Sequence, residues 1–174
     1  MDNRERIDAL DVALENEMSE RAFYLEHADR TKNPLGKAMF REIADDELEH
    51  YQRLKQLHEK WKESRKWPES VPLTVRQTNI RNLVEATIAA SKGVAEDNTD
   101  DLKAIEIAAR FEAKGQDFYA TLRDNADDPK EKAFFALLSG IEREHYLSLK
   151  DAEEYLKDPE SWLRRTERHT LDGA

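Results

Sequence analysis

The 174-residue chain contains no cysteine. Without thiols the chain can form neither a disulfide framework, nor a cysteine-ligated zinc site, nor an iron–sulfur centre. If the protein takes part in redox chemistry, we therefore expect the electrons to come from a separate donor.

Glycine, proline and long apolar runs are also scarce. The chain has 5 Gly and 5 Pro, with 38% charged and 39% hydrophobic residues, a balance that favours long amphipathic helices over sheets or disorder. No stretch approaches the roughly 20 apolar residues of a membrane span, and the first residues lack the apolar segment of a signal peptide. We expect one domain, located in the cytoplasm.

Acidic residues outnumber basic residues. There are 28 Lys and Arg against 38 Asp and Glu, which gives a net charge of −10. Nucleic acids and anionic membrane surfaces are bound by clustered basic faces, so we expect neither as a partner. Metal cations suit such a chain better.

What the sequence does contain is an internal repeat. Glu47-x-x-His50 recurs 95 positions later as Glu142-x-x-His145. The same shift aligns residues 9–55 with 104–150 without a gap, and 16 of the 47 positions are identical. Other repeated pairs are Glu17/Glu112, Phe23/Phe118, Tyr24/Tyr119, Pro34/Pro129 and Tyr51/Tyr146. The chain therefore reads as a duplicated helical hairpin.

Apolar periodicity and breaking residues predict four long helices. We expect the first at about 4–29 and the second from 34 to near Trp67. The third should begin near Thr99, and the fourth should end near Lys157. Asn33-Pro34 and Asp128-Pro129 each provide a capping residue followed by proline at the first helical position. Residues of about 68–99 would cross the bundle, with a short helix at 79–91. Residues 159–169 would add a short helix through Trp162 and Leu163.

The repeated glutamates lie on apolar faces. Positions three, four and seven residues from Glu17, Glu47, Glu112 and Glu142 are mainly apolar or aromatic. An unpaired buried carboxylate costs several kcal/mol, and four together would also repel. Because no Lys or Arg lies beside them on these faces, bound cations are the favoured explanation. A buried hydrogen-bonded network is the alternative.

Other polar repeats and histidines fit simpler roles. His27, His58 and His169 have no repeat partner, so we expect solvated or packing roles for them. Glu49 and Glu144 do repeat, but they lie two residues beyond the first glutamate of each motif and hence on another face. We expect them to form solvated ion pairs.

The arrangement of these residues resembles that of the ferritin-like carboxylate superfamily. In that superfamily, two helices each contribute a glutamate and two others each contribute a Glu-x-x-His motif. Within it, the chain is similar to the rubrerythrin family over about residues 5–157. The similarity rests on Glu17-x6-Tyr24, Glu112-x6-Tyr119, the Phe-Tyr pairs and the Glu-x-x-His-Tyr ends. The closing Leu171-Asp172-Gly173-Ala174 also looks like the tail of members without a rubredoxin domain.

This resemblance implies an all-α, ferritin-like four-helix bundle built from two repeated hairpins, with a long crossover and a short C-terminal helix. Residues 1–157 would form the bundle, with repeat halves at about 5–60 and 100–155, and 158–174 would form a tail.

The resemblance also implies two irons bridged by Glu47 and Glu142, although nitrogen and oxygen ligands accept manganese or zinc as well. Glu17 and His50 would complete one metal position, and Glu112 and His145 the other. Tyr24 and Tyr119 would hold ligand carboxylates by hydrogen bonds, or simply pack as core aromatics.

The chain departs from the family pattern in two respects. It has no cysteine-rich rubredoxin segment, and Gly115 occupies the place of an additional glutamate. The repeat-related position holds Glu20, which is either a seventh ligand or a solvated side chain.

The expected function is reduction of hydrogen peroxide or O2 at a di-iron centre. An external rubredoxin or reductase would supply electrons, and a homodimer is expected. Two other functions are compatible with the same residues: a ferroxidase that handles iron, and a non-catalytic helical module with structural metals.

Overall fold

A computed structural model describes residues 3–64, 82–83, 86, 99–162 and 164. Within these residues the chain forms four long helices and no strand: α1 (Asn3–Arg30), α2 (Pro34–Ser64), α4 (Thr99–Asn125) and α5 (Pro129–Lys157). The prediction of an all-α helical bundle is confirmed, and the helix limits agree closely with those expected from the sequence.

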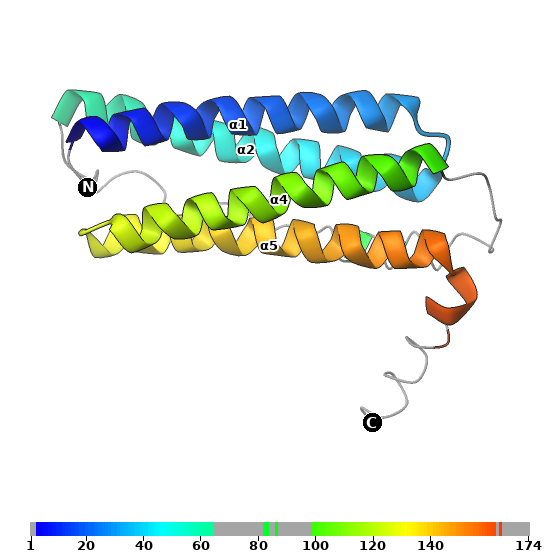
Figure 1. The fold of residues 1–174 in the computed structure, drawn as a ribbon. Helices are drawn as coiled ribbons and strands as arrows, with labels where there is room; N and C mark the ends of the chain where they lie inside the picture. The colour runs from blue at the N-terminus through cyan, green and yellow to red at the C-terminus, as the bar shows by residue number, and fades with distance from the viewer. Residues whose placement is uncertain (1–2, 65–81, 84–85, 87–98, 163, 165–174) are drawn as a thin grey trace.

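The helices pair in the order of the repeat. The closest partners are α1 with α2 and α4 with α5, whereas α1 with α4 and α2 with α5 approach less closely. Figure 1 shows the two hairpins side by side with all four axes roughly parallel. The face-to-face contact of two hairpins leaves the space in which the polar centre lies.

Side-chain caps start the second helix of each hairpin. Asn33 Oδ1 accepts hydrogen bonds from the backbone N–H of Leu35 at 2.9 Å and of Gly36 at 3.3 Å. Asp128 accepts equivalent bonds from Lys130 at 2.7 Å and Glu131 at 3.4 Å. Proline follows each cap, where its missing N–H would have no helical partner anyway.

Two apolar clusters flank the middle of the bundle. One gathers the C-terminal ends of α1 and α5 with the N-terminal ends of α2 and α4, and includes Tyr24, Phe40 and Tyr155. The other lies at the opposite end and includes Trp61 and Phe135. Each cluster excludes water from one end of the polar centre, so the centre is enclosed along the bundle axis.

Several predicted features fall partly or wholly outside the described residues. Trp67 and most of 79–91 are among them, although residues 82, 83 and 86 are helical. Residues 159–162 are helical, and the buried Trp162 packs edge-on against Tyr155, while Leu163 and His169 lie outside. None of the described helices is sufficiently long and apolar to cross a membrane.

Candidate metal centre

Four glutamates and two histidines meet in the middle of the bundle. Glu17 comes from α1, Glu112 from α4, and each of α2 and α5 contributes one Glu-x-x-His pair. All six side chains are buried, with Glu17 at 2% exposure and the others at 0–1%. The six residues singled out by the repeat thus lie together.

These side chains form two overlapping groups that could each hold a metal ion. One contains Glu17, Glu47, His50 and Glu142, and the other contains Glu47, Glu112, Glu142 and His145. Within each group, one ligand atom per residue lies within 4.8 Å of all the others. Because Glu47 and Glu142 belong to both groups, their carboxylates are placed to serve two neighbouring ions.

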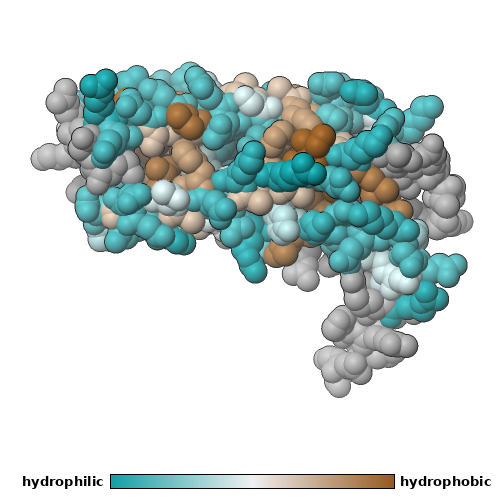
Figure 2. Space-filling view, in the orientation of Figure 1, coloured by the Kyte–Doolittle hydropathy of each residue, from teal (hydrophilic) through white to brown (hydrophobic). Residues whose placement is uncertain are grey.

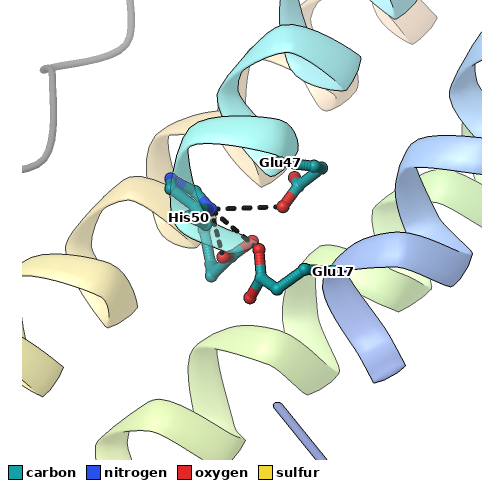
Figure 3. A group of neighbouring side chains, drawn as sticks. Glu17, Glu47 and His50 are labelled. Atoms are coloured by element: carbon teal, nitrogen blue, oxygen red, sulfur yellow. Dashed lines mark hydrogen bonds and ion pairs between the residues drawn. The ribbon is translucent and has the colours of Figure 1, made fainter. Parts of the chain in front are cut away.

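Both histidines turn Nδ1 toward the carboxylates. His50 Nδ1 lies 3.1 Å from an oxygen of Glu17 and 3.1 Å from one of Glu47, and Figure 3 shows these side chains converging from α1 and α2. His145 Nδ1 lies 3.2 Å from Glu112 and 3.5 Å from Glu47. The rings stand 6.0 Å apart and nearly parallel, so one nitrogen from each half faces the shared carboxylates.

Two tyrosines connect the halves. The Tyr24 hydroxyl of α1 donates to Glu112 on α4, and the Tyr119 hydroxyl of α4 donates to Glu17 on α1. Each tyrosine thus holds the glutamate of the other hairpin, rather than the one two turns away on its own helix. Both rings are buried.

Burial and mutual repulsion raise the pKa values of several acids. Burial, followed by the charge of Glu47, raises the pKa of Glu17 to about 8. The pKa of Glu142 is raised well above its ordinary value by burial and by the charges of Glu47 and Glu112. These carboxyl groups therefore tend to hold protons in the protein alone.

The pKa values of Glu47 and His50 shift in the directions that favour their charged forms. Burial alone would raise the pKa of Glu47, but the charge of the adjacent His50, its hydrogen bond and the nearby His145 lower it below the usual range. Burial opposes protonation of His50, yet the carboxylates of Glu17 and Glu47 raise its pKa to about 10. Protons thus provide the positive charge that a bound cation would replace, as expected of metal ligands.

The donor set fits a pair of cations. Oε1 of Glu47 and both carboxylate oxygens of Glu142 are buried and have no hydrogen-bond donor among the described residues. Buried acceptors are nearly always satisfied, so atoms of this kind require an explanation. Carboxylate oxygen and imidazole nitrogen together suit iron, manganese and zinc.

Asp46, beside the ligands, was not predicted from the sequence. Its carboxylate is 1% exposed and lies 3.1 Å from Nε2 of His145 on the other hairpin. The repeat offered no signal, because the corresponding position in the second half is Ile141. Its place next to Glu47 in the chain was the one available hint.

Glu20 lies near the centre but in neither group. It is partly buried, and burial together with the charges of Glu47 and Glu112 raises its pKa to about 10. Its side chain lines an open cavity of about 650 Å³ between α1 and α4, shared with three phenylalanines, Lys114 and Gly115. Figure 2 shows apolar surface between polar margins on this face.

Gly115 lies between that cavity and the centre. A Cβ at this position would lie 3.4 Å from the Glu142 carboxylate, so a side chain here would stand between the cavity and the shared glutamate. With glycine, only the backbone of α4 lies between the cavity and this part of the Glu142 side chain.

The other singled-out residues lie away from the centre. His27 donates from Nδ1 to the Phe23 carbonyl oxygen and packs on the Phe23 ring. His58 is buried, with Nε2 2.9 Å from Asp11, rather than solvated. Glu49 pairs with Arg53 at 3.7 Å, as expected for a residue outside the cluster.

A helical bundle with this arrangement of glutamates and Glu-x-x-His motifs defines the class of ferritin-like carboxylate proteins. Comparison with known proteins gave no match among curated proteins or solved structures. The family model for rubrerythrin, however, matches residues 8–153. The chain therefore belongs to the rubrerythrin family.

Proposed function

We propose that the protein binds two iron ions and reduces hydrogen peroxide, or O2, with electrons from an external donor. The observation that carries this proposal is the pair of overlapping ligand groups, with Glu47 and Glu142 common to both. Glu17 and His50 would complete one position, and Glu112 and His145 the other. Manganese or zinc could occupy the same ligands.

When bound, two ferrous ions would supply one electron each, so that one peroxide and two protons give two molecules of water. The chain's own residues prepare the site for this chemistry. The apolar clusters exclude water, and Tyr24 and Tyr119 fix the two glutamates that face single ions.

The cavity beside Gly115 supports the choice of a small substrate. It is open, and Gly115 in its lining lies close to the Glu142 carboxylate. A molecule of two oxygen atoms needs only part of about 650 Å³, and the neighbouring Glu20 carboxyl could exchange a proton with it. We retain Glu20 as a candidate seventh ligand as well.

The first test is the number of metal ions bound. After anaerobic reconstitution with Fe(II), the chain should retain two ions, and Glu47→Ala or Glu142→Ala should lose both, because each carboxylate serves both positions. Glu49→Ala and Glu144→Ala are matched controls, since they are repeated acids on another face and should retain two ions. A single ion in the parent, or two in either bridging variant, would disprove the shared-ligand arrangement.

The second test distinguishes the alternatives. The reduced protein should be oxidised much faster by hydrogen peroxide than by O2, and should stop after one equivalent unless a reductant is added. Faster reaction with O2, together with accumulation of many irons per chain, would favour a ferroxidase. Bound metals that react with neither oxidant would favour a structural role.

We propose that rubredoxin or a reductase restores the reduced state, that the chain forms a homodimer, and that it works in the cytoplasm. Sedimentation analysis would test the dimer, and recovery of turnover with added rubredoxin and its reductase would test the donor.

A further inference from the structure

The two halves of the centre differ at the far nitrogen of each histidine. In the 95-residue repeat, His50 corresponds to His145, but Asp46 corresponds to Ile141. The residue in front of each shared glutamate is therefore an acid in one half and an aliphatic side chain in the other. This difference is buried: Asp46 is 1% exposed and Ile141 is 4% exposed.

On one side, Asp46 fixes the imidazole. His145 Nε2 lies 3.1 Å from Asp46 Oδ2, while Nδ1 faces Glu112 and Glu47. With the proton on Nε2 donated to Asp46, the lone pair of Nδ1 points toward the carboxylates. Carboxylate–histidine contacts of this kind set the tautomer and raise the basicity of the ligand nitrogen.

On the other side, no such contact exists among the described residues. His50 Nε2 is buried and has no hydrogen-bond partner there. A proton on Nδ1 can bond to Glu17 or Glu47, both at 3.1 Å, but it then occupies the nitrogen that would bind metal. Moving the proton to Nε2 frees Nδ1 but leaves a buried N–H unsatisfied, which is unfavourable.

We propose that Asp46 is a positioning residue that makes the two metal positions unequal. The position served by Glu112 and His145 fills first and holds its ion more tightly, while that of Glu17 and His50 fills second and exchanges its ion more readily. This inference rests on the proposed metal-binding function, and it concerns the order and affinity of binding.

Anaerobic titration of the full chain with Co(II), followed by calorimetry and visible absorption, would test the proposal. We expect two steps whose affinities differ by roughly 10- to 100-fold, the range found when an outer partner of a metal-bound histidine is removed. His145→Ala should abolish the tight step, and His50→Ala the weak one. These two variants decide the order even if substitutions at position 46 fail to fold.

Substitutions at the unequal positions test the cause. Asp46→Asn, which keeps the size of the side chain, should weaken the tight step by roughly 10- to 100-fold and leave the weak step unchanged. Ile141→Asp should tighten the weak step, because it offers His50 Nε2 an acceptor. Combining Asp46→Ile with Ile141→Asp should reverse the order of filling.

The outcomes separate the inference from the function on which it rests. If the parent binds no Co(II) and no Fe(II), the metal-binding function itself is wrong. If two ions bind with equal affinity, or if Asp46→Asn weakens both steps alike, the metal centre stands and the positioning role of Asp46 is overturned.

Discussion

The Tyr119 hydroxyl reaches across the bundle to the Glu17 carboxyl group, and Tyr24 makes the equivalent bond to Glu112. These bonds link the two hairpins directly. Because the carboxyl groups are buried, losing the donor leaves an acceptor that water cannot easily satisfy.

Replacing either tyrosine should therefore destabilise the protein. Tyr119→Phe and Tyr24→Phe should each lower the free energy of unfolding by about 1–3 kcal/mol, measured by urea denaturation. Tyr51→Phe, at a partly buried position next to His50, is the matched control and should change stability little. Unaltered stability in both cross-hairpin variants would show that the bonds contribute nothing net.

A second residue-scale prediction concerns Glu20, which lines the cavity beside the centre. If its carboxylate binds or adjoins the irons, Glu20→Gln removes a negative charge that favours the oxidised state. The variant should then keep two metals, show a higher reduction potential and have an altered charge-transfer spectrum. Glu15→Gln, exposed on the same helix, is the control. A Glu20 variant that matches the parent in both measurements would limit the centre to six ligands.

At the scale of the helices, the capping residues give a prediction about each hairpin. Asn33→Ala and Asp128→Ala each remove two hydrogen bonds to backbone N–H groups at a helix start. Each should lower the free energy of unfolding by about 1 kcal/mol in thermal or urea denaturation. Lys32→Ala, exposed in the same connection, should have little effect. Equal stability of the capped and uncapped proteins would contradict the role assigned to these side chains.

The helices also show which features a sequence can predict. Helix limits and caps depend on neighbours within a few residues, so periodicity, Asn33-Pro34 and Asp128-Pro129 were sufficient. The six clustered residues were found because the repeat marks them twice on apolar faces. The repeat does not reveal which side chains meet between the hairpins. These contacts are the bond from each tyrosine to its glutamate and the contact of Asp46 with His145. Those contacts depend on how the hairpins dock.

At the scale of the whole molecule, the centre couples stability to pH and to metal. Glu17 holds its proton up to a pKa of about 8 in the fold, against an ordinary 4.5, and His50 up to about 10, against 6.5. In both cases the folded chain binds a proton more tightly than the unfolded chain. Their stabilisation is complete below the ordinary pKa values and is lost as pH rises through the raised ones.

The chelator-treated protein should therefore become less stable between pH 7 and pH 9. A group that is protonated in the folded chain and deprotonated in the unfolded chain lowers the free energy of unfolding as pH rises. The decrease is at most about 1.4 kcal/mol per pH unit for each such group. Bound metal displaces these protons, so the reconstituted protein should be more stable and should not show the same decline. Urea denaturation at pH 7, 8 and 9, with chelator and with Fe(II) under anaerobic conditions, would measure both. Stability that increases over this range in chelator would contradict the assignment.

The crossed tyrosines have a consequence for the history of the chain. One hairpin carries a glutamate, a Glu-x-x-His motif and a tyrosine that reaches the other hairpin, so two separate copies related by a twofold axis would together contain every repeated group of the centre. Two identical copies, however, come from one gene, so every substitution appears at the equivalent position in both. A single chain that contains both copies is free of that restriction, so Asp46 can correspond to Ile141, and Glu20 to Gly115, in the two halves of the repeat.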